Sequence, residues 1–133
     1  AVYLTHGNLA FLTVHLIAPD GTAITLADVS SNATALGTTC PAGSDDVIFD
    51  DAAPRAIETA PAPYAGTYRP NGPLATFVGR SGSQVNGGWK LRAENRSTVH
   101  AGVLRCATIT LNGHTYTAGT CNRPGELFAN GFE

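Results

Sequence analysis

The sequence predicts an all-β fold, a β-sandwich or jelly roll, on three observations. Apolar and polar residues alternate in several short segments that end at Gly, Pro, Asn or Asp, the pattern of half-buried strands joined by turns. No window of useful length repeats its apolar residues with helical spacing and caps. Five prolines between residues 52 and 73 deny that stretch a helix or a central strand, because proline lacks a backbone N–H group. Many short strands with Gly/Pro turns are typical of sandwiches and jelly rolls.

The strand-like segments follow one another along the chain. In the segment after the Pro19-Asp20-Gly21 turn, Ile24 and Leu26 share one face. We read residues 27–45 as a long loop and residues 52–73 as an ordered surface connection anchored by its tyrosines, Tyr64 and Tyr68. The predicted strands cover residues 2–4, 11–17, 22–26, 47–49, 89–93 and 103–111.

The pair Asn112-Gly113 predicts a two-residue hairpin turn, because both central positions of such a turn need positive φ. Folding about it pairs residue 111 with residue 114, and each further pair also sums to 225. In this hairpin Ala107, Ile109 and Leu111 would face the core. Residues 114–117 would form the returning strand, with His114 still in the turn.

The three cysteines are spaced for a disulfide rather than for zinc, since none forms a CxxC pair. The hairpin register places Cys106 opposite residue 119, two residues short of Cys121. A bulge or a wider loop would close that gap, so we predict a Cys106–Cys121 disulfide. Cys40 would be left unpaired or would compete for one partner. A disulfide implies an oxidising compartment.

The charges are few and unevenly distributed. They make up 14 % of the residues with a net charge of −2, and no Lys/Arg run suits a nucleic-acid partner. Residues 1–54 contain six acids and no Lys or Arg, whereas all eight basic residues lie from Arg55 onward. The acidic segment is solvated, binds a cation or faces the basic half. For a cation, Asp45-Asp46 and Asp50-Asp51 offer hard oxygen ligands close together.

No residue pattern predicts catalysis. A G-x-S-x-G elbow is absent, Cys40 lies in no catalytic signature, and His15 falls on the polar face of a strand. Asp50 and Asp51 are adjacent, so on a strand they would point to opposite faces, which suits a turn or an ion better than acid–base chemistry. Trp89, the only tryptophan, is interpreted as a core residue rather than a sugar-stacking platform. We therefore predict no enzyme activity.

Four segments of the chain carry motifs: Thr5-His6 with 12–22, Phe49-Asp50-Asp51-Ala52, Gly66 to Gly79, and Asn86 to Leu91 with Gly102, Leu104 and Ile109. In this order they resemble the patterns THxxxGDLxxxLxSPxGT, FDD-A, G-Y-x-P-x-x-P-L-x-x-F-x-G and NGxWxLxxxD…GxLxxxxLxI. These are the patterns of the P domain of kexin- and furin-like convertases and of bacterial subtilisin-type proteases. Together the matches cover roughly residues 2–111.

The resemblance implies a β-sandwich jelly roll over residues 1–121, followed by a C-terminal tail over residues 122–133. It also implies a non-catalytic accessory domain of a secreted, bacterial, subtilisin-like serine protease that stabilises or modulates the neighbouring catalytic domain. Some members bind calcium, for which Asp50 and Asp51 would be the remaining ligands. The alternatives are a binding or adhesion module for carbohydrate or protein and a free-standing enzyme. No membrane span is expected, since no stretch of about 18 apolar residues occurs.

The chain departs from the family pattern at charged positions. Ala10-Phe11 stands where the family has Gly-Asp, and Asn95 and His100 replace two family acids. The family's first N-terminal strand is absent, and a start at Ala1 without Met indicates a processed or excised fragment. The tail ending in Phe128-Ala129-Asn130-Gly131-Phe132-Glu133 is either a terminal motif of secreted proteins or an end whose phenylalanines dock on the sheet.

Overall fold

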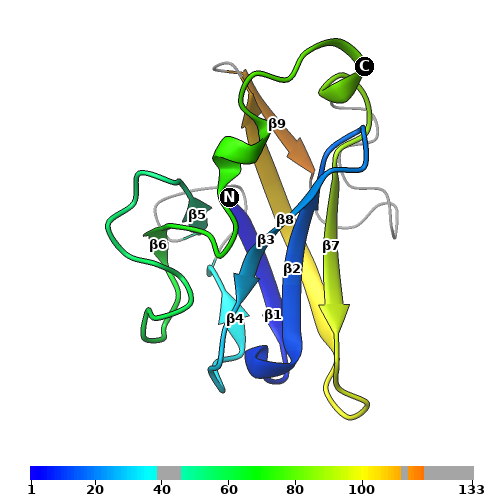
Figure 1. Cartoon of the computed structure of the whole chain (residues 1–133). Helices are drawn as coiled ribbons and strands as arrows, with labels where there is room; N and C mark the ends of the chain where they lie inside the picture. Colours follow the sequence, from blue (N-terminus) through cyan, green and yellow to red (C-terminus); the bar gives the residue numbers. More distant parts are fainter. Residues whose placement is uncertain (39–45, 112–113, 119–133) are drawn as a thin grey trace.

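The computed structural model describes residues 1–38, 46–111 and 114–118, which form two β-sheets (Figure 1). The six-stranded sheet has the order β6-β5-β1-β8-β9, with β4 also paired to β1, and the three-stranded sheet has the order β3-β2-β7. Three short 3-10 helices and no α-helix occur in this part of the chain. The elements are β1 (Val2–His6), η1 (Leu9–Phe11), β2 (Leu12–Ile17), β3 (Ala23–Asp28), β4 (Ala35–Leu36), β5 (Val47–Phe49), β6 (Gly66–Tyr68), η2 (Leu74–Phe77), η3 (Gly82–Gln84), β7 (Lys90–Asn95), β8 (Gly102–Leu111) and β9 (His114–Ala118).

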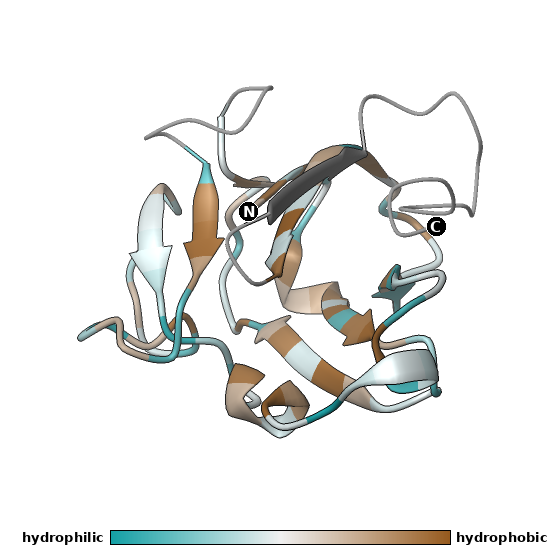
Figure 2. Ribbon diagram, turned by 90° about the horizontal axis from the view of Figure 1, so that it is seen from above, coloured by the Kyte–Doolittle hydropathy of each residue, from teal (hydrophilic) through white to brown (hydrophobic). Residues whose placement is uncertain are grey.

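The core lies between the two sheets, because each contributes alternate apolar side chains to it. The six-stranded sheet curls like half a barrel around one side, as the view from above shows (Figure 2). Leu4 of β1 and Val14 of β2 are buried at 2 % and 1 % exposed, and Trp89, just before β7, is also 1 % exposed. The mostly β prediction and the interpretation of Trp89 as a core residue are confirmed.

The β8–β9 hairpin has the predicted register. Leu111 lies opposite His114, and Ala107 lies opposite Ala118 at the far end of the pairing. Ala107 is buried, and Ile109 and Leu111 pack against the core as predicted. One detail of the prediction is wrong, because His114 is the first residue of β9 rather than a turn residue.

The stretch predicted as a long loop contains a strand. Ala35 and Leu36 form β4, which pairs with Thr5 and Leu4 of β1. Leu36 is 1 % exposed, and Val29 earlier in the stretch is 3 % exposed. The Ser/Thr/Ala-rich sequence carries no periodicity here, so pairing with β1 decides the conformation.

The proline-rich connection is ordered and holds only one short strand. Its strand β6 pairs with β5 alone, at the end of the six-stranded sheet, as expected for a segment that proline keeps from central positions. Tyr64 and Tyr68 are 3 % and 2 % exposed, and the Tyr68 hydroxyl donates a hydrogen bond to the Ala65 carbonyl at 3.0 Å. Both tyrosines therefore anchor the connection, as predicted.

Candidate functional site

The two aspartates proposed as metal ligands directly follow strand β5, and the structure gives each a hydrogen-bonding role. Asp51 Oδ1 accepts from the Leu74 N–H at 2.8 Å and its Oδ2 accepts from the Ala75 N–H at 2.7 Å. These are the first two amides of η2, so the carboxylate caps that 3-10 turn from a distant segment. The neighbouring Asp50 is exposed, and its Oδ1 accepts from the Ala52 N–H at 2.9 Å.

The segment of residues 73–80, here called the wall segment, is also held at its other end. Arg80 donates to a carboxylate oxygen of Asp20 and, through Nε, to the Thr76 carbonyl at 3.1 Å. The Asp20 carboxylate itself accepts from the Thr22 N–H at 2.9 Å. This amide, with a smaller contribution from Arg80, lowers the pKa of Asp20 from its usual value. Carboxylates from two separate loops thus fix the wall segment at both ends.

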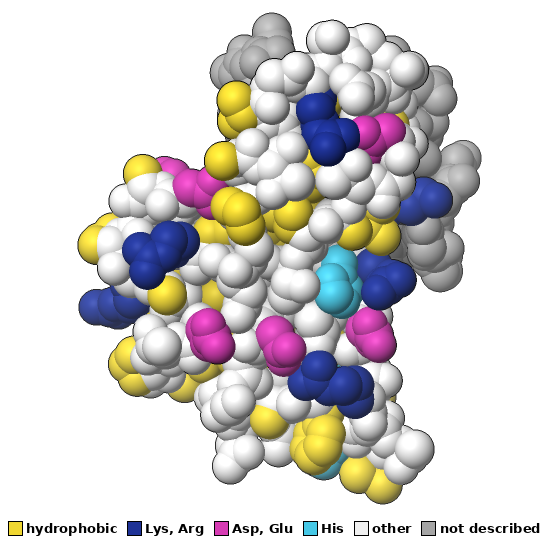
Figure 3. Space-filling model, in the orientation of Figure 1, with side chains coloured by type: hydrophobic (Ala, Val, Ile, Leu, Met, Phe, Trp, Pro, Cys, Tyr) yellow, Lys and Arg dark blue, Asp and Glu magenta, His cyan; other side chains and the backbone are white. Residues whose placement is uncertain are grey.

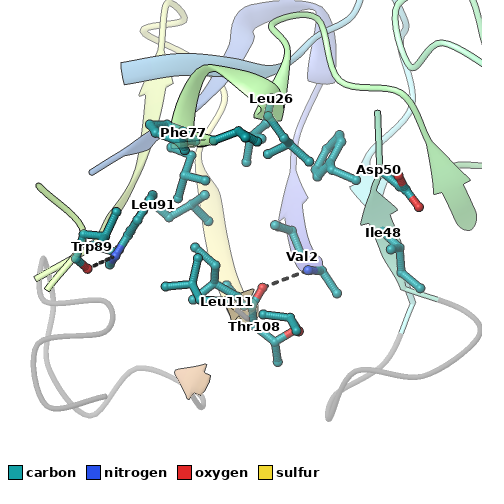
Figure 4. A pocket seen from close by; sticks show the side chains of 18 of the residues that line it. Val2, Leu26, Ile48, Asp50, Phe77, Trp89, Leu91, Thr108 and Leu111 are labelled. Carbon is teal, nitrogen blue, oxygen red and sulfur yellow. Dashed lines mark hydrogen bonds between the residues drawn. The ribbon is translucent and has the colours of Figure 1, made fainter. Parts of the chain in front are cut away.

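The wall segment borders a cleft of about 670 Å³ that the first two residues of the chain also line (Figure 4). Both sheets contribute to it: Leu26 comes from β3, Leu91 from β7, Val2 from β1 and Leu111 from β8. Its polar groups include the side chains of Asp50, Asn86, Arg80, Thr108 and Thr110. A hollow of this size, lined by apolar and polar groups in nearly equal measure, suits a small amphipathic ligand or an inserted side chain.

Phe77 and Trp89 form the aromatic side of the cleft. Phe77, at the end of η2, meets Trp89 edge to face, with ring centroids 5.1 Å apart. The Trp89 indole N–H donates to the Val85 carbonyl at 2.9 Å. Because Trp89 is almost fully buried, it offers no exposed ring face on which a sugar could stack. Asp51 holds η2 in place, and η2 places Phe77 against Trp89 on one side of the cleft.

The described side chains of His15 and His100 serve local structure. His15 lies on the outer face of β2, with Nδ1 3.3 Å from Thr25 Oγ1 and Nε2 3.5 Å from a Glu94 carboxylate oxygen. His100 Nδ1 lies 2.9 Å from Ser97 Oγ, which also accepts from the backbone N–H groups of Val99 and His100. That serine is thus part of a turn rather than an oriented nucleophile.

His6 is buried at 3 % exposed beneath the loop that joins β7 to β8. Its Nδ1 lies 2.7 Å from the Asn8 carbonyl oxygen and 3.1 Å from the Asn8 backbone nitrogen, so either tautomer of the ring finds a partner there. Gly102 is needed beside it, because a Cβ at that position would lie 2.6 Å from His6 Cδ2. His6 lines a small second cavity of about 150 Å³ near Asn95 and Leu104. No sequence pattern predicts this packing of His6 against Gly102.

The acidic and basic halves of the chain meet, which was one of the three alternatives for the charge distribution. Arg80 pairs with Asp20, and Arg96 lies 3.2 Å from a carboxylate oxygen of Asp28. Figure 3 shows basic and acidic side chains side by side on the face that carries β3, β2 and β7. Both pairs are exposed or half-exposed, so each adds little stability.

The cysteine prediction falls largely outside the described residues. Cys106 is buried on β8 opposite Tyr3, at 4 % exposed. Cys40, Cys121 and the tail over residues 122–133 are not among the described residues, so the disulfide and the tail stay predictions.

Within the described part of the chain, no group of three His, Cys, Asp or Glu side chains could hold a metal ion. No helix there is long and apolar enough to cross a membrane. No protein-family model, curated protein or solved structure shows a significant match to this chain.

Proposed function

We propose that this chain is a non-catalytic accessory module of a secreted, bacterial, subtilisin-like serine protease, with the P-domain jelly roll as its architecture. The observation that carries the proposal is the bond between two of the four family-like segments. Asp51 of the Phe49–Ala52 segment caps the turn at Leu74 in the Gly66–Gly79 segment. The strands of these two segments also pair in parallel, with Phe49 opposite Tyr68. Two segments that resemble the family pattern are thus joined by side-chain hydrogen bonds and by strand pairing.

The proposed absence of catalysis agrees with the bonding of the polar side chains. The hydroxyl of Ser97 and the ring of His100 hold the β7–β8 loop, and His15 lies among polar side chains on an outer sheet face. A catalytic triad needs a nucleophile hydrogen-bonded to a base, and that base hydrogen-bonded to an orienting acid. His100 has the Ser97 hydroxyl on Nδ1. His15 lies between the Thr25 hydroxyl at 3.3 Å and a Glu94 carboxylate oxygen at 3.5 Å, but that carboxylate is exposed and also pairs with Arg92 at 3.2 Å.

The parent gene tests the proposal directly. A subtilisin-type catalytic domain should be encoded upstream of Ala1, and its thermal inactivation should be faster when residues 1–133 are deleted. The isolated chain should not hydrolyse casein. A parent protein without a hydrolase domain, or casein turnover by the pure chain, would contradict the proposal.

The cleft favours a second candidate, a binding module of a secreted protein. Its volume of about 670 Å³ lies in the range of small-ligand sites. Trp89 lines it and is the only tryptophan, so its fluorescence reports occupancy. We expect an apolar probe such as anilinonaphthalene sulfonate to change the Trp89 emission, and Phe77→Ala to weaken that effect. A soluble glycan library that leaves the emission unchanged would argue against the carbohydrate form of this candidate.

The resemblance implies calcium ligands at Asp50 and Asp51, whereas their hydrogen bonds favour a structural role. Both oxygens of Asp51 already accept backbone N–H groups, so the carboxylate has a structural role without an ion. We therefore expect the same melting temperature in EDTA and in millimolar calcium. A rise with calcium that Asp50→Asn or Asp51→Asn abolishes would instead establish a site, since a ligand that binds the native state raises its stability by mass action.

A further inference from the structure

The strand β7 is an open edge of the three-stranded sheet. It pairs with β2 on one side and has no partner on the other side among the described residues. Of its six residues only Leu91 is half-buried, and the other five are exposed. An exposed edge strand presents unpaired N–H and C=O groups that readily accept another strand.

The backbone groups that face this open edge can be assigned. The Arg96 N–H donates to the Phe11 carbonyl at 2.8 Å, next to the Asn95–Leu12 pair of the β2–β7 register. Because successive residues of a strand direct their N–H groups to opposite sides, Glu94, Arg92 and Lys90 also bond toward β2. The N–H and C=O groups of Leu91, Ala93 and Asn95 therefore point outward.

The side chains of β7 match a second copy of themselves when the strands run antiparallel about Ala93. In that register Ala93 faces Ala93 of the second copy and Leu91 faces Asn95, so every outward-facing backbone group finds a partner. Arg92 then faces Glu94 of the second copy, and Glu94 faces its Arg92. These charged residues occupy the non-hydrogen-bonded pairs, where facing side chains approach most closely.

We propose that β7 is a homodimerisation edge, at which two copies of this chain join their three-stranded sheets into one continuous six-stranded sheet. Arg92 and Glu94 are 59 % and 53 % exposed and lie on the same outer face, where they pair with each other at 3.2 Å within one chain. Dimerisation would exchange this exposed pair for two equivalent pairs between the copies. The proposal is independent of the accessory function above, because it rests only on the edge and its charges.

Charged residues on an edge strand can either prevent or favour pairing with a second copy. The signs of the charges decide which of these effects applies. A strand with charges of one sign would repel its own copy. Here a positive and a negative residue lie symmetrically about Ala93 and attract theirs. Lys90 would face Arg96 of the second copy, but Arg96 already has an Asp28 carboxylate 3.2 Å away that offsets its charge.

Charge exchange tests the proposal in solution. Sedimentation equilibrium of residues 1–133 from about 10 µM to about 1 mM should show a monomer–dimer equilibrium. The dimer would form by strand addition at the exposed edge. Arg92→Glu places carboxylates face to face twice and should weaken the dimer about tenfold or more. The double variant Arg92→Glu with Glu94→Arg should restore it. Arg55→Glu, the same charge change on an exposed residue between β5 and β6, is the matched control.

A cross-link tests the register separately. Facing hydrogen-bonded residues have Cα atoms about 5.5 Å apart, within reach of a disulfide. Ala93→Cys should therefore form a covalent dimer under mild oxidation, whereas Ala52→Cys, exposed after β5, should not. A monomer at 1 mM, equal dimerisation of wild type and Arg92→Glu, or equal cross-linking of the two cysteine variants would overturn the proposal. Circular dichroism of each variant confirms that the fold is kept.

Discussion

Replacing Asp51 with alanine should lower the free energy of unfolding by about 2 kcal/mol. The carboxylate accepts two backbone hydrogen bonds, 2.8 Å from Leu74 N and 2.7 Å from Ala75 N. Loss of a capping side chain costs about 0.5–2 kcal/mol, and hydrogen bonds to charged groups contribute about 1.5–3 kcal/mol. Asp51 is only half-buried, so water replaces part of this interaction, and about 2 kcal/mol, where the two ranges overlap, applies.

Urea unfolding followed by the fluorescence of Trp89 measures this loss, because Trp89 is the only tryptophan and packs against the turn that Asp51 caps. For a domain of this size, about 2 kcal/mol corresponds to a melting temperature lower by about 6–10 °C. Asp51→Asn keeps one acceptor oxygen and should lose about half as much. Asp50→Ala removes one local bond to Ala52 and should cost about 0.5 kcal/mol.

The order of the three variants carries the test. If Asp51→Ala and Asp50→Ala destabilise the chain equally, the cap does not hold the wall segment and its assignment to Asp51 is refuted. Calcium supplies the second control. The three values should be the same in EDTA and in calcium if Asp51 acts through hydrogen bonds alone.

Three further predictions concern packing and pH. Gly102→Ala should destabilise by about 1–3 kcal/mol, because the new Cβ would lie 2.6 Å from His6 Cδ2, and His6→Ala in the same chain should relieve most of that loss in a thermal melt. Phe77→Ala should cost about 2 kcal/mol in urea unfolding, less than for a fully buried phenylalanine because the ring is half-buried; an unchanged tryptophan emission would contradict its place in the cleft. The pKa of Asp20 is lowered, first by the Thr22 amide, so its stabilising effect is present above the ordinary value of 3.8 and is lost as pH falls through the lower folded value. The stability difference between wild type and Asp20→Asn should therefore be greatest near neutral pH and vanish in acid, and a difference independent of pH would refute this reasoning.

Local patterns determined most of the strands. The alternation over residues 11–17 and 103–111 and the Asn112-Gly113 turn predicted β2, β8 and the hairpin register, since side-chain period and turn chemistry act over a few residues. The proline content correctly kept residues 52–73 out of central strands. The burial of Trp89 followed from its place in a small β domain.

Only the tertiary structure decided the contacts that define the candidate site. The strand β4 exists because β1 lies beside it, and no periodicity in its two residues announces that. Asp51 serves a turn that begins 23 residues later, and Arg80 reaches an aspartate 60 residues earlier. Such bonds depend on where distant loops meet, which a sequence pattern does not encode. The charge asymmetry between the two halves was visible in the sequence, but only the fold shows which acids face which bases.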